Sequence, residues 1–171
     1  MSEQRHLELL LGNRIFASLS STDAQALYGA GVLVTVPAGQ VLFVQGDHAD
    51  GFYLVLKGYF GVSLEGAEGD AVPLAGVGPG ETLGEMGIVT VAPRSATVTA
   101  IMESVAWHLS ADVFEGLVAR GDPMGTAILR SMGRDLCRRF RASVAEGASL
   151  VARQVRGDEA EVHVDSLGWE V

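Results

Sequence analysis

The feature that most constrains the fold of this chain is the change of hydrophobic period at Val32. From Val32 to His108 the sequence is a series of short segments, rich in β-branched and aromatic residues, in which apolar and polar positions alternate. The segments are VLVTV, VLFV, FYLVL, YFGVSLE, AVPLAGV, ATVTAI and SVAWHL, and each is bounded by Gly, Pro, Asp or Ser. The 22 glycines and the low aromatic content of 6% favour a sheet protein with many turns over a helical bundle. Seven or eight strands at this spacing predict a jelly-roll-like barrel or sandwich.

Helical signals flank the predicted strands on both sides. Residues 3 to 11 predict a short helix, and the capping-box pattern Thr22-x-x-Gln25 predicts the start of a second helix that ends at Gly29 to Gly31. Towards the C-terminus, Ser110 is a candidate cap for a helix over residues 111–119, and Asp122-Pro123 predicts the start of a longer helix that we expect Gly147 to end.

These signals divide the chain into four parts. We expect an N-terminal helical segment over residues 1–31, a β-roll over 32–110, C-terminal helices over 111–147 and a tail over 148–171. Alternating apolar residues from Val162 to Trp169 leave two alternatives open for the tail, a short strand or hairpin and a disordered end.

The last predicted helix carries one apolar stripe. Its members recur every fourth residue, at Ile128, Met132, Leu136, Phe140 and Val144. Such a stripe either packs against the roll of the same chain or forms a homodimer through the helix, and the sequence favours neither alternative.

The stretch Leu83 to Val98, LGEMGIVTVAPRSATV, has the layout of a small anion pocket. Gly84 allows the backbone to approach a ligand closely, and a short helix that starts at Glu85 directs unpaired N–H groups outward. Arg94 supplies a positive charge and the forked donors that a phosphate prefers. Because the carboxylate of Glu85 repels a phosphate, its useful partner is a hydroxyl donor to one side. A ligand that carries a phosphate beside a hydroxyl is a sugar phosphate, so the pattern predicts a ligand of this class.

This stretch resembles the phosphate-binding cassette of cyclic-nucleotide-binding domains. The resemblance lies in Gly84-Glu85, a short apolar helix, and PRSAT followed by Val-x-Ala. This family includes bacterial catabolite activator proteins, protein kinase A regulatory subunits and nucleotide-gated channels. The resemblance covers about residues 15 to 145. It implies a mainly β fold with flanking helices: a double-stranded β-helix, or jelly-roll-like β-roll, with N-terminal helices and C-terminal lid helices.

The resemblance also implies roles for residues of the cassette, residues 83–98. Arg94 is expected to pair with the cyclic phosphate and Glu85 to accept a hydrogen bond from the ribose 2′-OH. The remaining residues expected to line the pocket are Leu83, Gly84, Met86, Ser95 and Ala96. The presence of Ser rather than Thr at position 95 slightly favours cyclic AMP over cyclic GMP as the ligand.

The function that the resemblance implies is that of a regulatory module: a cyclic nucleotide sensor without catalysis, which signals to a protein partner. Two alternatives stay open, a ligand-free β-roll that serves as an interaction domain and a truncated DNA-binding transcriptional regulator. The net charge of -9 repels a polyanion, and the residues after Leu150 are too few for a winged helix-turn-helix. We therefore expect no nucleic acid partner.

Other chemistries find little support in the sequence. The histidines His6, His48, His108 and His163 are scattered without metal-ligand spacing, and no glycine-rich stretch has the Lys-Ser/Thr of a P-loop. Asp47 and Asp50 are interpreted as turn residues. We expect no cofactor and no metal.

The location expected from the sequence is the cytoplasm. The single cysteine, Cys137, forms no internal disulfide, and the N-terminus has neither a signal peptide nor a membrane span. No membrane partner is therefore expected.

Overall fold

The computed structural model describes residues 2–66 and 69–165 of the chain. The chain divides into two compact units, Met1–Gly133 and Arg134–Val171. The first unit holds the sheets and the shorter helices, and the second holds the greater part of the last helix.

Eight strands and five helices make up the described part of the chain. The strands are β1 (Val32–Val36), β2 (Val41–Phe43), β3 (Gly51–Lys57), β4 (Phe60–Glu65), β5 (Ala71–Val77), β6 (Thr82–Leu83), β7 (Thr97–Ala100) and β8 (Ser104–Ser110). The helices are α1 (Glu3–Gly12), α2 (Ser21–Ala30), α3 (Glu85–Thr90), α4 (Ala111–Ala119) and α5 (Pro123–Asp165).

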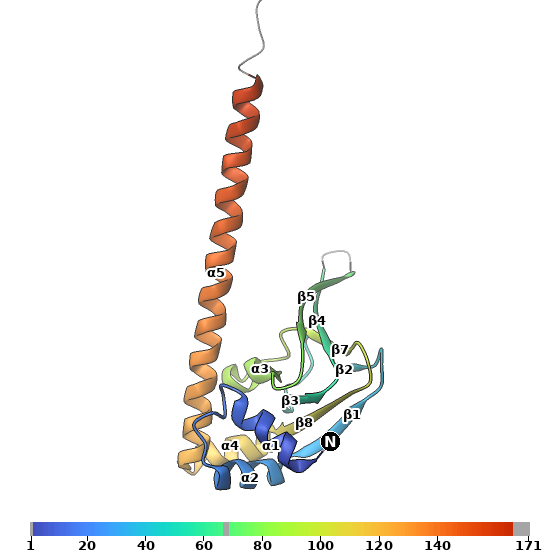
Figure 1. Cartoon of the computed structure of the whole chain (residues 1–171), viewed down its shortest axis with the longest axis vertical. Helices are drawn as coiled ribbons and strands as arrows, with labels where there is room; N and C mark the ends of the chain where they lie inside the picture. Colours follow the sequence, from blue (N-terminus) through green and yellow to red (C-terminus); the bar gives the residue numbers. More distant parts are fainter. Residues whose placement is uncertain (1, 67–68, 166–171) are drawn as a thin grey trace, which may run out of the picture. The chain divides into compact units, whose positions relative to one another are not determined.

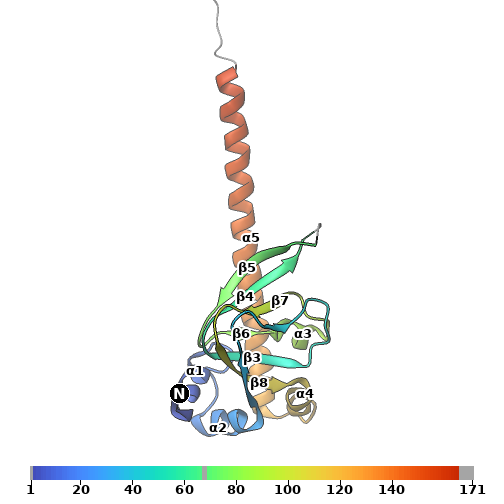
Figure 2. The same ribbon diagram turned by 90° about the vertical axis from the view of Figure 1, so that its right-hand side faces the viewer.

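The strands form two four-stranded antiparallel sheets that make a β-roll. The order is β1-β8-β3-β6 in one sheet and β2-β7-β4-β5 in the other. Helices α1, α2 and α4 lie together at one end of the roll, and α3 lies between β6 and β7 in sequence (Figures 1 and 2). The β-roll with flanking helices that the sequence predicted is confirmed, and the alternating segments of the sequence coincide with seven of its eight strands.

Strand β3 explains why FYLVL reads as a continuous apolar run. Successive side chains of a strand point to opposite faces, and both faces of β3 are covered. Phe52 and Leu54 belong to an apolar cluster shared with the helices, whereas Tyr53 and Val55 belong to a second cluster inside the roll. Strand β3 therefore connects the helical side of the domain to the interior of the roll.

The helix starts agree with the sequence in four of five cases, and the helices predicted from residue 3 and from Glu85 are confirmed as α1 and α3. Ser110 caps α4 by accepting a hydrogen bond from the Val113 N–H, and α5 begins at Pro123 as predicted. The capping box at Thr22 is wrong, because α2 is capped by Ser20, whose side chain accepts a hydrogen bond from the Asp23 N–H. Ser20 and Thr22 are both residues that can cap a helix, and the earlier one, Ser20, accepts the hydrogen bond from the first turn.

The predicted end of the last helix at Gly147 is wrong, because α5 continues to Asp165. A glycine in a helix interior costs about 1 kcal/mol relative to alanine but does not break the helix, and no proline follows Gly147. Neither alternative for the tail, a strand or hairpin or a disordered end, holds at Val162 and Val164, which are helical, while Leu167 and Trp169 lie outside the described residues. No helix of the described residues is long and apolar enough to cross a membrane.

The apolar stripe of α5 divides into a buried and an exposed part. Ile128 and Met132 are fully buried and belong to the cluster that contains Phe114 and Leu117 of α4. Phe140, by contrast, is 70% exposed. The start of the stripe thus packs within the chain, and its continuation leaves apolar surface uncovered.

This division predicts different outcomes for two charge substitutions on one helix. Met132→Glu places a carboxylate in an apolar cluster and should lower the free energy of unfolding by several kcal/mol, on the order of the cost of burying a charge. Phe140→Glu is the matched control and should leave it nearly unchanged when both proteins are dilute enough to be monomeric. Denaturant unfolding followed by circular dichroism measures both, and a native-like midpoint for Met132→Glu would contradict the burial of this side chain.

Candidate functional site

The candidate site begins where β6 passes into α3. Gly84, the residue between them, has φ +81°, a left-handed conformation that favours glycine. A Cβ at this position would overlap Nη1 of Arg94. Gly84 is therefore required both for the turn and for the close approach of the arginine, and the short helix predicted from Glu85 is confirmed as α3.

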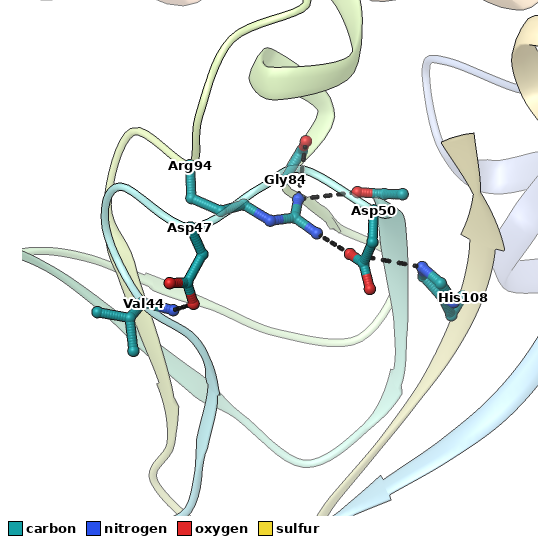
Figure 3. A network of polar contacts seen from close by, with 7 residues as sticks. Val44, Asp47, Asp50, Gly84, Arg94 and His108 are labelled. Atoms are coloured by element: carbon teal, nitrogen blue, oxygen red, sulfur yellow. Dashed lines mark hydrogen bonds and ion pairs between the residues drawn. The ribbon is translucent and has the colours of Figure 1, made fainter. Parts of the chain in front are cut away.

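The segment after α3 directs Arg94 into the protein. Val91 ends the helix in a left-handed conformation with its side chain 85% exposed, and Pro93 follows two residues later. The Arg94 N–H then donates to the Asp47 carbonyl oxygen at 2.8 Å, which fixes the backbone against the loop before β3. Asp47 also accepts a hydrogen bond from the Val44 N–H at its carboxylate, as expected of a turn residue (Figure 3).

Arg94 is the centre of a polar network, with its side chain only 1% exposed. Nη1 donates to the carbonyl oxygens of Gly51 and Gly84 at 2.8 and 3.2 Å, and Nη2 donates to Oδ1 of Asp50 at 2.5 Å (Figure 3). A buried charge is tolerated only when it is paired and hydrogen-bonded, and this network meets both conditions.

Aromatic rings complete the surroundings of the guanidinium. Its Cζ lies 4.1 Å from the centre of the Phe43 ring and 5.7 Å from the centre of the Tyr53 ring. An aromatic face attracts a cation, and more strongly where water is excluded. These contacts hold the guanidinium plane without using any of its N–H donors.

One donor of Arg94 stays available. Nε is buried and has no hydrogen-bond partner among the described residues. An arginine binds a phosphate or carboxylate most strongly through two neighbouring N–H groups. Nη1 and Nη2 already donate to the two carbonyl oxygens and to Asp50 (Figure 3). The Nε side of the guanidinium is therefore the side that is left for an anion.

The other residues predicted to line the pocket differ in their exposure to solvent. Glu85 is buried at the start of α3. Leu83, just before Gly84 in the sequence, and Ala96, two residues after Arg94, are also buried. Met86 and Ser95 are exposed, and the Ser95 hydroxyl lies 3.7 Å from the Met86 sulfur. The cassette thus offers a buried charged part and an exposed rim.

Asp50 and His108 are residues of the network that the sequence did not reveal. Oδ1 of Asp50, which accepts from Arg94, lies 4.0 Å from Nε2 of His108, and the His108 ring stacks on Tyr53 with centroids 4.5 Å apart (Figure 3). Burial lowers the pKa of His108, Asp50 opposes this effect and Arg94 adds to it. Burial also raises the pKa of Tyr53. Asp50 looked like a turn residue because its partner is 44 positions away.

A separate cavity of about 230 Å³ lies between α3, the loop before β3 and α4. It is lined by His48, Ala49, Gly87, Ile88, Val91, Ala92, Pro93, Ala111, Asp112 and Glu115. Half of these residues belong to the cassette, but none of the seven residues predicted to line the nucleotide pocket is among them. We place the candidate site at Arg94 and not in this cavity, because among the described residues Arg94 is a buried cation with an unused donor and no arginine or lysine lines the cavity.

Comparison with known families agrees with this geometry. The family model described as "Cyclic nucleotide-binding domain" matches residues 33–121, more than half of the chain. The chain therefore belongs to the cyclic nucleotide-binding domain family.

Curated relatives contain this domain as a small part of longer proteins. An uncharacterized NTE family protein of Mycobacterium tuberculosis is 32% identical over 126 residues, which are 73% of this chain and 21% of the relative. The lysophospholipase nte1 of Aspergillus oryzae is 38% identical over 84 residues, which are 49% of this chain and 6% of the enzyme. The chain spans about a fifth or less of the length of these relatives.

Several solved structures are similar to this chain in fold. The N-terminal domain of a transcriptional regulator from Streptomyces coelicolor has a TM-score of 0.68 at 32% identity, with 78% of this chain and 93% of that chain covered. A cyclic nucleotide-binding domain from Methylobacillus flagellatus has a TM-score of 0.73 at 26% identity, covering 84% and 80%. The regulatory domain of Toxoplasma gondii PKA, solved with cAMP, has a TM-score of 0.63 at 28% identity, covering 68% and 45%.

The position of Gly84 leads to a prediction with a matched control. Gly84→Ala should destabilise the protein by roughly 1–3 kcal/mol from backbone strain and displace the Arg94 guanidinium, so that ligand binding weakens as well. Gly39 has nearly the same φ, +79°, but open space around it, so Gly39→Ala carries the strain alone. Thermal unfolding and titration with cyclic AMP compare the two variants. Equal effects on binding would contradict the overlap with Arg94.

Proposed function

We propose that this chain is a regulatory module that binds a cyclic nucleotide at residues 83–98, with cyclic AMP preferred over cyclic GMP. Arg94 pairs with the cyclic phosphate in this proposal, and Glu85 accepts a hydrogen bond from the ribose 2′-OH. The exposed rim at Met86 and Ser95 contacts the ligand, and Leu83, Gly84 and Ala96 shape the pocket. The module has no catalytic step and no cofactor of its own.

The observation that carries the proposal is the state of Arg94. Its charge is buried among polar partners and aromatic rings, and its Nε donor has no partner among the described residues. A buried unsatisfied donor is costly, so an acceptor that reaches it gains more than it would at an exposed arginine. A phosphate oxygen is an acceptor of this kind, and it brings the negative charge that the site favours.

The ligand preference has two supports. Position 95 is Ser rather than Thr, and a domain of similar structure, the regulatory domain of Toxoplasma gondii PKA, was solved with cAMP. Both favour cyclic AMP as the first ligand to test.

Signalling is proposed to pass from the cassette to the helices through Ile88. This α3 residue belongs to the same buried cluster as Phe114 and Leu117 of α4 and Met132 of α5. Leu83 packs inside the roll instead and Met86 is exposed, so neither takes part in this contact. A ligand that favours one position of α3 then shifts the packing of the helices by population shift.

The output of the module is proposed to be a protein contact. The exposed apolar residues of α5, Phe140 and Val144, are suited to a partner protein or to a second copy of the chain. A homodimer through this helix is a proposal that light scattering of the wild type and of Phe140→Glu tests directly.

Substitution of Arg94 tests the phosphate contact. A charge-assisted hydrogen bond contributes roughly 1.5–3 kcal/mol, so Arg94→Ala should weaken cyclic AMP binding by about two orders of magnitude or more. Arg94→Lys keeps the positive charge but lacks the forked pair of N–H donors, so it should retain only part of the wild-type affinity. Isothermal titration with cyclic AMP and cyclic GMP gives the values. Absence of binding to either nucleotide below millimolar in the wild type would instead favour a ligand-free interaction domain.

Substitution of Glu85 tests the sugar contact in a cycle between protein and ligand. Glu85→Ala should weaken cyclic AMP clearly and hardly change the binding of its 2′-deoxy analogue, since that analogue lacks the hydroxyl. Titration of both proteins with both ligands isolates this single contact. Equal losses for the two ligands would show that Glu85 holds the cassette in place and does not recognise the ribose.

A further inference from the structure

His108 is a buried titratable group in the site that neither phosphate nor ribose recognition uses. Its side chain is 15% exposed, and its Nε2 is buried without a hydrogen-bond partner among the described residues. Oδ1 of Asp50 lies 4.0 Å from Nε2, too far for a hydrogen bond. In Figure 3 the His108 ring and Arg94 lie on opposite sides of the Asp50 carboxylate.

The surroundings hold this ring in place. It stacks on Tyr53, and Gly51 leaves room for it, because a Cβ at Gly51 would overlap Nε2. The same Gly51 accepts a hydrogen bond from Arg94 through its carbonyl oxygen. Strand pairing places His108 opposite both Tyr53 of β3 and Val32 of β1. The charged or titratable groups facing the ring are thus Asp50, Arg94 and Tyr53.

The charge balance of the network changes when an anion arrives. Without a ligand, the positive charge of Arg94 is matched by the negative charge of Asp50. A cyclic phosphodiester adds one negative charge, so Asp50 and the phosphate compete for one buried cation. A proton on His108 offsets the added charge, and its Nε2–H then becomes a charge-assisted donor to Asp50 after a small approach.

We propose that His108 takes up a proton when a cyclic phosphate binds at Arg94, and that the protonated ring holds Asp50 in place while the phosphate uses Arg94. This inference rests on the proposed function of the cassette. His108 is a positioning residue in it, since it acts on the phosphate through Asp50 and Arg94.

The direction of the pH dependence follows from the sign of the linkage. Burial, the largest cause, keeps the pKa of His108 below its ordinary value in the free protein, and the added phosphate charge raises it in the complex. Affinity is therefore highest below the pKa of the free state and falls as the pH rises through the pKa of the bound state. Tyr53, whose pKa is raised by burial, stays neutral in this range. The cyclic phosphodiester has no second proton to lose, so the ligand does not contribute.

The experiment is isothermal titration of the full chain with cyclic AMP in two buffers of different ionisation enthalpy, imidazole and MES, at about pH 6.5. The dependence of the observed enthalpy on buffer ionisation should show net proton uptake in the wild type. It should vanish in His108→Gln and persist in His48→Gln, the matched control at an exposed histidine of the same domain. Affinity should fall on the order of fivefold or more between about pH 5.5 and about pH 8 in the wild type and in His48→Gln, but not in His108→Gln.

A second measurement needs no substitution. NMR titration of the histidine ring resonances in the wild type should give a higher pKa for His108 with cyclic AMP than without it. Binding with no proton uptake, or uptake that persists in His108→Gln, would overturn this inference and leave the proposed function standing. Absence of cyclic nucleotide binding in the wild type would overturn both.

Discussion

A guanidinium that is almost fully buried must replace its lost hydration with protein partners, and the candidate site is built around this requirement at Arg94. Asp50 supplies the counter-charge, the carbonyl oxygens of Gly51 and Gly84 accept from Nη1, and the face of Phe43 covers the plane. The requirement extends to the backbone, because Gly84 has no room for a side chain. The arginine therefore organises a region of the roll as well as offering a donor to a ligand.

Strand β3 connects this site to both apolar clusters of the domain. Its Tyr53 faces the arginine and the interior of the roll, whereas its neighbours Phe52 and Leu54 face the helices. Helix α3 makes a second connection, since it starts at Gly84 beside the arginine and buries Ile88 in the helical cluster. The proposed coupling from the anion site to the helices would thus pass through side chains that are already packed against one another.

An anion site in a chain with a net charge of -9 depends on local rather than overall electrostatics. Charges more than about 8–10 Å apart are largely screened at physiological salt, but a buried pair is screened much less. In the proposed function, the attraction at Arg94 therefore acts at short range and favours a small anion. The same overall charge disfavours a polyanion, which would have to lie along the surface.

The sequence by itself determined the parts of this protein that depend on neighbouring residues. The two-residue period predicted seven of the eight strands, the Ser110 cap and Asp122-Pro123 marked two helix starts, and the order Gly84-Glu85 to Arg94 marked the cassette. Only the tertiary structure brought Asp50 and His108 to Arg94, because strand pairing across long loops decides such contacts and leaves no periodic trace in the sequence. It also decided that Gly147 lies inside a helix and that Met132 is buried while Phe140 is exposed, since burial depends on what packs against a residue and not on its place in a pattern.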